Sequence, residues 1–147
     1  MEKIVYRSVV EIWEVVERFE RCVYRPEDFT HGRHLTVAAW YLEKDPSSAL
    51  VRMREGLQRF LAHHGKQSGY HETITRFWML LLARSLQAAP LDWSLARRNT
   101  YVVACFQDKN VLFAYYSRDR VLSEEARMGW LEPDLQPIET EELRPAR

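Results

Sequence analysis

Long apolar runs and an excess of one charge are both missing from this sequence. Its 147 residues include 21 basic and 21 acidic side chains, whereas a nucleic-acid-binding protein needs a basic excess on its surface. The longest uncharged apolar run covers residues 77–83, far short of the roughly 20 residues that a membrane-spanning helix needs. We therefore expect neither a nucleic-acid partner nor a membrane partner.

Cysteine, glycine and proline are also scarce. The two cysteines, Cys22 and Cys105, are too few for a disulfide framework or a thiolate metal site. With five Gly, six Pro and 46% hydrophobic residues, the composition excludes collagen-like arrays and is not that of a disordered chain. Charged residues follow Met1 directly, so we expect no secretory leader. The composition predicts a soluble, cytoplasmic protein.

What the sequence does contain is helical periodicity. Apolar residues recur at three- and four-residue spacing in five successive stretches between residues 9 and 106. Thr30, Asp45 and Asp92 are predicted N-caps, and Gly65 is suited to the position just after a helix. The pattern therefore predicts an all-α fold, a single-domain bundle of about five helices.

The last part of the sequence has a different composition. Residues 131–147 contain three prolines among acidic side chains, and their apolar residues show no helical spacing. We therefore predict a helical bundle domain over residues 1–130 and a short extended tail over residues 131–147.

Histidine is the most informative residue type. Four histidines align with, or lie beside, the apolar stripes of the second, third and fourth predicted helices. Short connections make consecutive helices antiparallel, which brings the start of the second, the end of the third and the start of the fourth to one end of the bundle. These four histidines are His31, His34, His64 and His71, and Glu72 and Thr75 lie near the last of them.

Imidazoles that converge with a carboxylate suit metal binding or acid–base chemistry. We predict the four histidines as ligands of a divalent transition metal, Zn or Fe, with Glu72 and Thr75 as catalytic side chains. The known motif is incomplete, because His71 and Glu72 begin an H-E-x-x-H pattern in which Thr75 replaces the second histidine. The first hypothesis is a metal-binding protein, or a metal-dependent enzyme, that acts on a small molecule.

Helix polarity favours an alternative. His31, His34 and His71 lie in or near the first turns of two helices, where the positive end of the helix dipole attracts anions. Arg33 adds charge there, and Tyr70 is well placed to line a pocket, so both are predicted to bind a ligand or cofactor. The alternative is a non-catalytic module for a small anion or a partner, and the histidines are otherwise hydrogen-bonded plugs at helix ends.

Two segments resemble the signatures of a family of small uncharacterised bacterial all-α proteins. Residues 29–35 match F-x-H-x-x-H-L, residues 70–75 match Y-H-E-T-x-T, and residues 130–135 are similar to that family's usual ending. Gly69 stands where the family typically has lysine. The resemblance implies no reaction type. It implies that the signature includes His31, His34, His71, Glu72 and Thr75.

Overall fold

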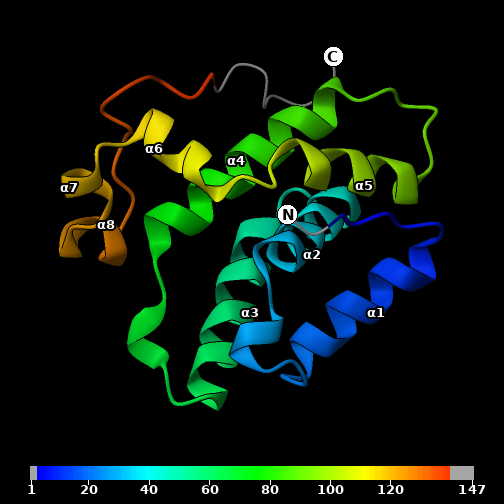
Figure 1. Ribbon diagram of the computed structural model, residues 1–147, viewed down its shortest axis with the longest axis horizontal. Coiled ribbons are helices and arrows are strands. Elements are labelled where there is room, and N and C mark those ends of the chain that lie inside the picture. Colours follow the sequence, from blue (N-terminus) through cyan, green and yellow to red (C-terminus); the bar gives the residue numbers. More distant parts are fainter. Residues whose placement is uncertain (1–2, 140–147) are drawn as a thin grey trace.

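The computed structural model describes residues 3–139, which are all-helical with no strand among them (Figure 1). The five long helices are α1 (Val9–Glu20), α2 (His31–Lys44), α3 (Ala49–His63), α4 (Glu72–Ala88) and α5 (Leu95–Cys105). The shorter elements are α6 (Leu112–Tyr115), α7 (Arg118–Val121), α8 (Glu124–Met128) and the 3₁₀ turns η1 (Pro26–Asp28), η2 (Gln67–Gly69) and η3 (Lys109–Val111). The all-α prediction is confirmed for this part of the chain, in which no helix is long and apolar enough to cross a membrane.

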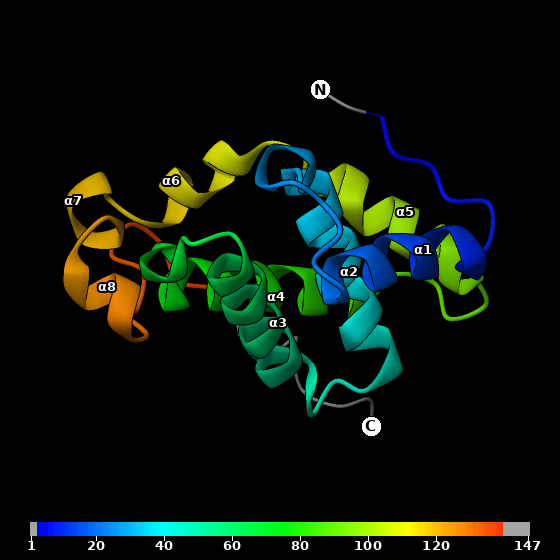
Figure 2. The ribbon, with the colours of Figure 1, turned by 90° about the horizontal axis from the view of Figure 1, so that it is seen from below.

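Helix α2 is the central element. It contacts α1, α3, α4 and α5, and in both ribbon views it lies between α1 and α3 (Figure 1 and Figure 2). Its buried residues include small side chains such as Ala38 and Ala39, which allow neighbouring helices to approach closely. The first turn of α2, which carries His31 and His34, is consequently held on several sides.

Helix α4 is shared by two hydrophobic cores. Met79 and Leu82 pack into the larger core with α1, α2, α3 and α5. Phe77 and Leu81 pack into a smaller core with residues from α6, α7 and the segment after α8. Figure 1 shows α6, α7 and α8 gathered on one side of the molecule. The long apolar stripe of this helix therefore reflects burial on two faces.

The segment after α8 has no helix through residue 139 and packs against the rest of the structure. The backbone N–H of Leu131 donates to Thr73 Oγ1 at 3.1 Å, and Leu135 N–H donates to the carbonyl of Tyr115 at 2.9 Å. Ile138 is buried in the smaller core. The predicted tail is therefore free of helix over residues 131–139 and lies against α4 and α6, while residues 140–147 lie outside the described part.

The predicted helix ends are partly right. Thr30 Oγ1 accepts the N–H of Arg33 as the N-cap of α2, and Gly65 has a φ of +70° just after α3. The Asp45 prediction is wrong, because its carboxylate accepts from the two serines that follow Pro46 and forms a turn, so α3 begins only at Ala49. The Asp92 prediction is also wrong, because the cap of α5 is the hydroxyl of Ser94.

Candidate functional site

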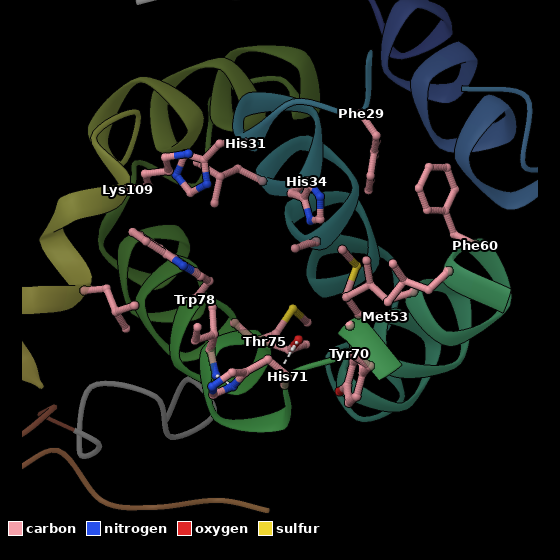
Figure 3. A pocket seen from close by; sticks show the side chains of 18 of the residues that line it. Phe29, His31, His34, Met53, Phe60, Tyr70, His71, Thr75, Trp78 and Lys109 are labelled. Atoms are coloured by element: carbon pink, nitrogen blue, oxygen red, sulfur yellow. Dashed lines mark hydrogen bonds between the residues drawn. The ribbon is translucent and has the colours of Figure 1, made fainter. Parts of the chain in front are cut away.

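A cavity of about 630 Å³ lies between α2, α3, the start of α4 and the η3–α6 segment (Figure 3). This volume is within the range typical of small-molecule pockets. Most of its wall is apolar, formed by Phe29, Leu35, Met53, Leu57, Phe60, Ile74, Trp78, Met79, Leu112 and Phe113 among others. The polar side chains in the wall are those of His31, His34, Tyr70, His71, Thr75, Lys109 and Asn110.

The cavity gathers five of the eight residues that the sequence predicts for a site. They are His31, His34, Tyr70, His71 and Thr75. The start of α2 and the start of α4 both border the cavity, which brings these side chains together. The other three, Arg33, His64 and Glu72, do not line the cavity and hold positions described below.

His71 is fully occupied by hydrogen bonds. Its Nδ1 accepts the backbone N–H of Ile74 at 3.1 Å, which makes this imidazole the N-cap of α4. Its Nε2, at 2.8 Å from the carbonyl oxygen of Val121, must carry the proton and donate. Burial lowers the pKa of His71, which keeps the ring neutral and preserves the cap. His71 therefore joins α4 to α7 and has no free nitrogen for a metal or a substrate proton.

Replacing His71 with alanine should lower the free energy of unfolding by about 1–3 kcal/mol, because a helix cap and a long-range hydrogen bond are both lost. His71→Asn should lose less, since asparagine retains the capping interaction without reaching Val121. His63→Ala, at the exposed end of α3, serves as the matched control. Urea denaturation measures all three, and unchanged stability in His71→Ala would show that this ring is not a structural plug.

His31 has one nitrogen committed to the protein. Its Nε2 donates to the carbonyl of Phe106 at 2.8 Å, and its ring lies edge-on to Trp78 with centroids 4.8 Å apart. Burial lowers the pKa of His31, and the nearby Lys109 ammonium lowers it further. The neutral ring therefore contributes one hydrogen-bond acceptor, Nδ1, to this end of the cavity.

His34 differs from the other two histidines of the cavity wall because no protein group within residues 3–139 hydrogen-bonds its ring. The imidazole packs against Phe29, with centroids 4.1 Å apart, and points into the cavity (Figure 3). Desolvation, and to a lesser degree the neighbouring His31, lower the pKa of His34 to about 4. At neutral pH it is a neutral ring with one free N–H donor and one free acceptor.

Glu72 does not line the cavity and is not available for the catalytic role that the sequence predicts for it. Both of its carboxylate oxygens accept from Arg54 of α3, at 2.8 and 2.7 Å, and the Tyr70 hydroxyl donates to the same carboxylate at 2.7 Å. The Arg54 hydrogen bonds lower the pKa of Glu72, and burial next to this carboxylate raises the pKa of Tyr70 to about 12. The ion pair between Glu72 and Arg54 joins α3 to α4, so the Glu72 carboxylate is not a free general base.

Thr75, Arg33 and His64 also have local structural partners. The Thr75 hydroxyl, although in the cavity wall, donates to the His71 carbonyl one turn earlier. Arg33 donates to the Asp28 carbonyl at 2.6 Å. Its guanidinium lies 4.9 Å from the ring centroid of Tyr24. His64, as the C-cap of α3, donates to the Tyr24 carbonyl at 3.0 Å and so turns away from the cavity.

The four predicted metal ligands are not assembled into a coordination set. Among the side chains of residues 3–139, no three His, Cys, Asp or Glu residues are grouped to hold a metal ion. The physical reason is that His71 uses both ring nitrogens for backbone groups and His64 bonds outside the cavity. The arrangement therefore gives no support to a Zn or Fe centre.

Several cavity residues are ones that sequence reasoning treated as core or did not single out. Trp78, Met53 and Met79 lie on apolar stripes, and a stripe does not distinguish a side chain facing a cavity from one facing another side chain. Lys109 reaches the cavity because η3 folds back toward α2. No short-range signal in the sequence reports that return of the chain.

Comparisons with known proteins return no relative. The resemblance carried by residues 29–35 and 70–75 therefore stays a prediction. No family model, no curated protein and no solved structure matches this chain.

Proposed function

We propose that this chain is a binding module for a small, largely apolar molecule, which it holds in the cavity between α2, α3 and α4. The observation that carries this proposal is the state of His34. Its ring is half-buried and neutral, lacks a protein hydrogen-bond partner within residues 3–139, and faces a largely apolar cavity. The half-buried ring leaves its donor and acceptor available to a molecule in the cavity, so a ligand that hydrogen-bonds it gains affinity and selectivity.

The wall chemistry supports a neutral, flat or flexible apolar body. Phe29 and Trp78 offer aromatic surfaces, and Met53 and Met79 offer adaptable thioethers that fit around irregular shapes. A hydroxyl, carbonyl or amide on that body would meet the donor and acceptor of the His34 ring. The cavity takes its walls from α2, α3, α4 and the η3–α6 segment, which span much of the described chain. We therefore also propose that residues 3–139 work as a single domain.

The side chains predicted to be catalytic are already hydrogen-bonded within the protein, which favours binding without catalysis. A general base or nucleophile must reach the reacting atom with a free lone pair. Glu72 is held by Arg54 and Tyr70, Thr75 donates to a backbone carbonyl, and His71 is a helix cap. These commitments favour the binding-module alternative over a metal-dependent enzyme.

A matched pair of probes tests the role of His34. We expect 2-naphthol to bind about fivefold more tightly than 2-methylnaphthalene, because the two have nearly the same shape and only the hydroxyl can hydrogen-bond the imidazole. His34→Leu should still bind both probes but with equal affinity. His63→Leu should keep the preference for 2-naphthol. Quenching of tryptophan fluorescence, to which Trp78 in the cavity wall contributes, measures the affinities.

Two outcomes would contradict the proposal. If neither probe binds, the cavity does not take up small molecules. If both probes bind equally to the unaltered protein, the cavity is used but His34 does not select the ligand. A third variant, Ile74→Trp, fills the space from the half-buried start of α4 and should block both probes while leaving the far-ultraviolet circular dichroism unchanged, which shows whether binding occurs at this place.

A further inference from the structure

The side chains that line the cavity include one permanently charged group, and it is positive. Among the described lining residues there is no aspartate and no glutamate, and Lys109 is the one lysine or arginine in the wall. The nearest candidates for a counter-charge are engaged elsewhere. Glu72 pairs with Arg54, and Asp108 accepts the backbone N–H of Asn110 at 2.9 Å.

The Lys109 ammonium has no ion pair among residues 3–139. The side chain is exposed where η3 borders the cavity and also contributes to a second, shallower hollow with Thr30, Asp108 and Asn110. A lysine at the edge of a largely apolar wall, with its charge unpaired, adds a positive field to the half-open cavity. That field acts on whatever enters the cavity.

The polar and apolar lining residues are separated in space. In Figure 3, Lys109 and His31 lie together at one side, while Phe29, Met53 and Phe60 lie at the other. The groups facing His31 are the Lys109 ammonium, the Asp108 carboxylate, the His34 ring, the Trp78 ring and the Phe106 carbonyl. Burial first and Lys109 second disfavour a proton on His31, so a negative group placed here would relieve that effect.

We infer that the natural ligand is an amphipathic organic anion, with its apolar body against Phe29 and Met53 and its carboxylate or similar head beside Lys109 and His31. This inference rests on the proposed function and adds the class of ligand. The head lies beside the unpaired ammonium of Lys109, and the apolar body occupies the space between α2 and α3. His34, in the middle of the wall, contacts the portion between them.

Naphthalene-2-carboxylate and naphthalene-2-carboxamide form the test pair, since they share one apolar body and differ in charge. The unaltered protein should bind the carboxylate about fivefold more tightly at low salt, and added salt should reduce the difference. Lys109→Met should remove the preference and leave carboxamide affinity unchanged. Lys66→Met, at an exposed lysine that does not line the cavity, is the matched control and should behave like the unaltered protein.

The outcomes distinguish the two proposals. Equal binding of carboxylate and carboxamide to the unaltered protein, or an unchanged preference in Lys109→Met, would overturn the anionic ligand and leave the binding module standing. Absence of binding by both compounds would overturn the binding module itself. Far-ultraviolet circular dichroism of Lys109→Met should match the unaltered protein, because this side chain has no structural partner in residues 3–139.

Discussion

Replacing Arg98 with alanine is expected to lower the free energy of unfolding by about 3–5 kcal/mol. The side chain belongs to α5, is only 7% exposed, and donates from Nε to Glu43 of α2 at 2.9 Å. Its two terminal nitrogens donate to the carbonyls of Leu86, Ala89 and Pro90, which close the end of α4. Alanine would leave a poorly solvated carboxylate and these carbonyls without donors.

This loss would be a large part of the roughly 5–15 kcal/mol stability of an ordinary domain, so Arg98→Ala should unfold at a much lower urea concentration than the unaltered protein. Arg98→Lys should recover part of it, because an ammonium can pair with Glu43 but cannot reach four acceptors at once. The exposed neighbour Arg97, which lies over the ring of Trp93, provides the matched control. Arg97→Ala should lose less than about 1 kcal/mol. Urea titration measures the stability of all three variants. A small loss for Arg98→Ala would show that Arg98 does not hold α5 to α2 and to the end of α4.

The stability of the protein should fall on acidification, and His34 should account for about 2–3 kcal/mol of the fall. In the folded chain burial lowers the pKa of His34 to about 4, while the unfolded chain has the ordinary value near 6.5. Between about pH 4 and pH 6.5, the imidazole is protonated in the unfolded state and neutral in the folded state. Stability is therefore complete above about pH 6.5 and is lost as the pH falls toward about 4.

The variant His34→Leu isolates this contribution. Burial also lowers the pKa values of His31 and His71, so the unaltered protein loses stability from several rings in the same direction. The variant should lose about 2 kcal/mol less between about pH 7 and pH 4.5. Urea denaturation at several pH values gives the comparison. Equal pH dependence in the two proteins would mean that His34 is readily protonated in the fold.

Local sequence signals predicted much of the fold. The apolar spacing of α2 and α4, the Thr30 cap and the Gly65 turn depend on residues within one or two helical turns of each other, which a sequence displays directly. The errors at Asp45 and Asp92 arose where two candidate caps lie a few residues apart. In both places a serine nearer the helix begins it, and the aspartate instead lies in the preceding turn or loop.

The candidate site was only partly accessible to the same reasoning. Helix connectivity predicted that His31, His34 and His71 would lie at one end, and all three line the cavity. It could not predict that His71 would bond Val121, fifty positions later, or that Arg54 would neutralise Glu72. Such partners depend on side-chain directions across helices, and they decide whether a histidine is a ligand, a cap or a free recognition group.

Because α4 contributes to both cores, the two cores can shift relative to each other along this helix. We call this boundary between the cores the joint. Trp78 packs against both cores and also forms part of the cavity wall, so the cavity lies along the line where the two cores meet. Side chains that line the cavity have fewer protein neighbours than those inside either core, which makes this line more compliant than either core. An occupant would supply contacts from both sides. We expect a filled cavity to stiffen the joint, so that the region of α6, α7 and α8 moves with the rest of the protein as one body.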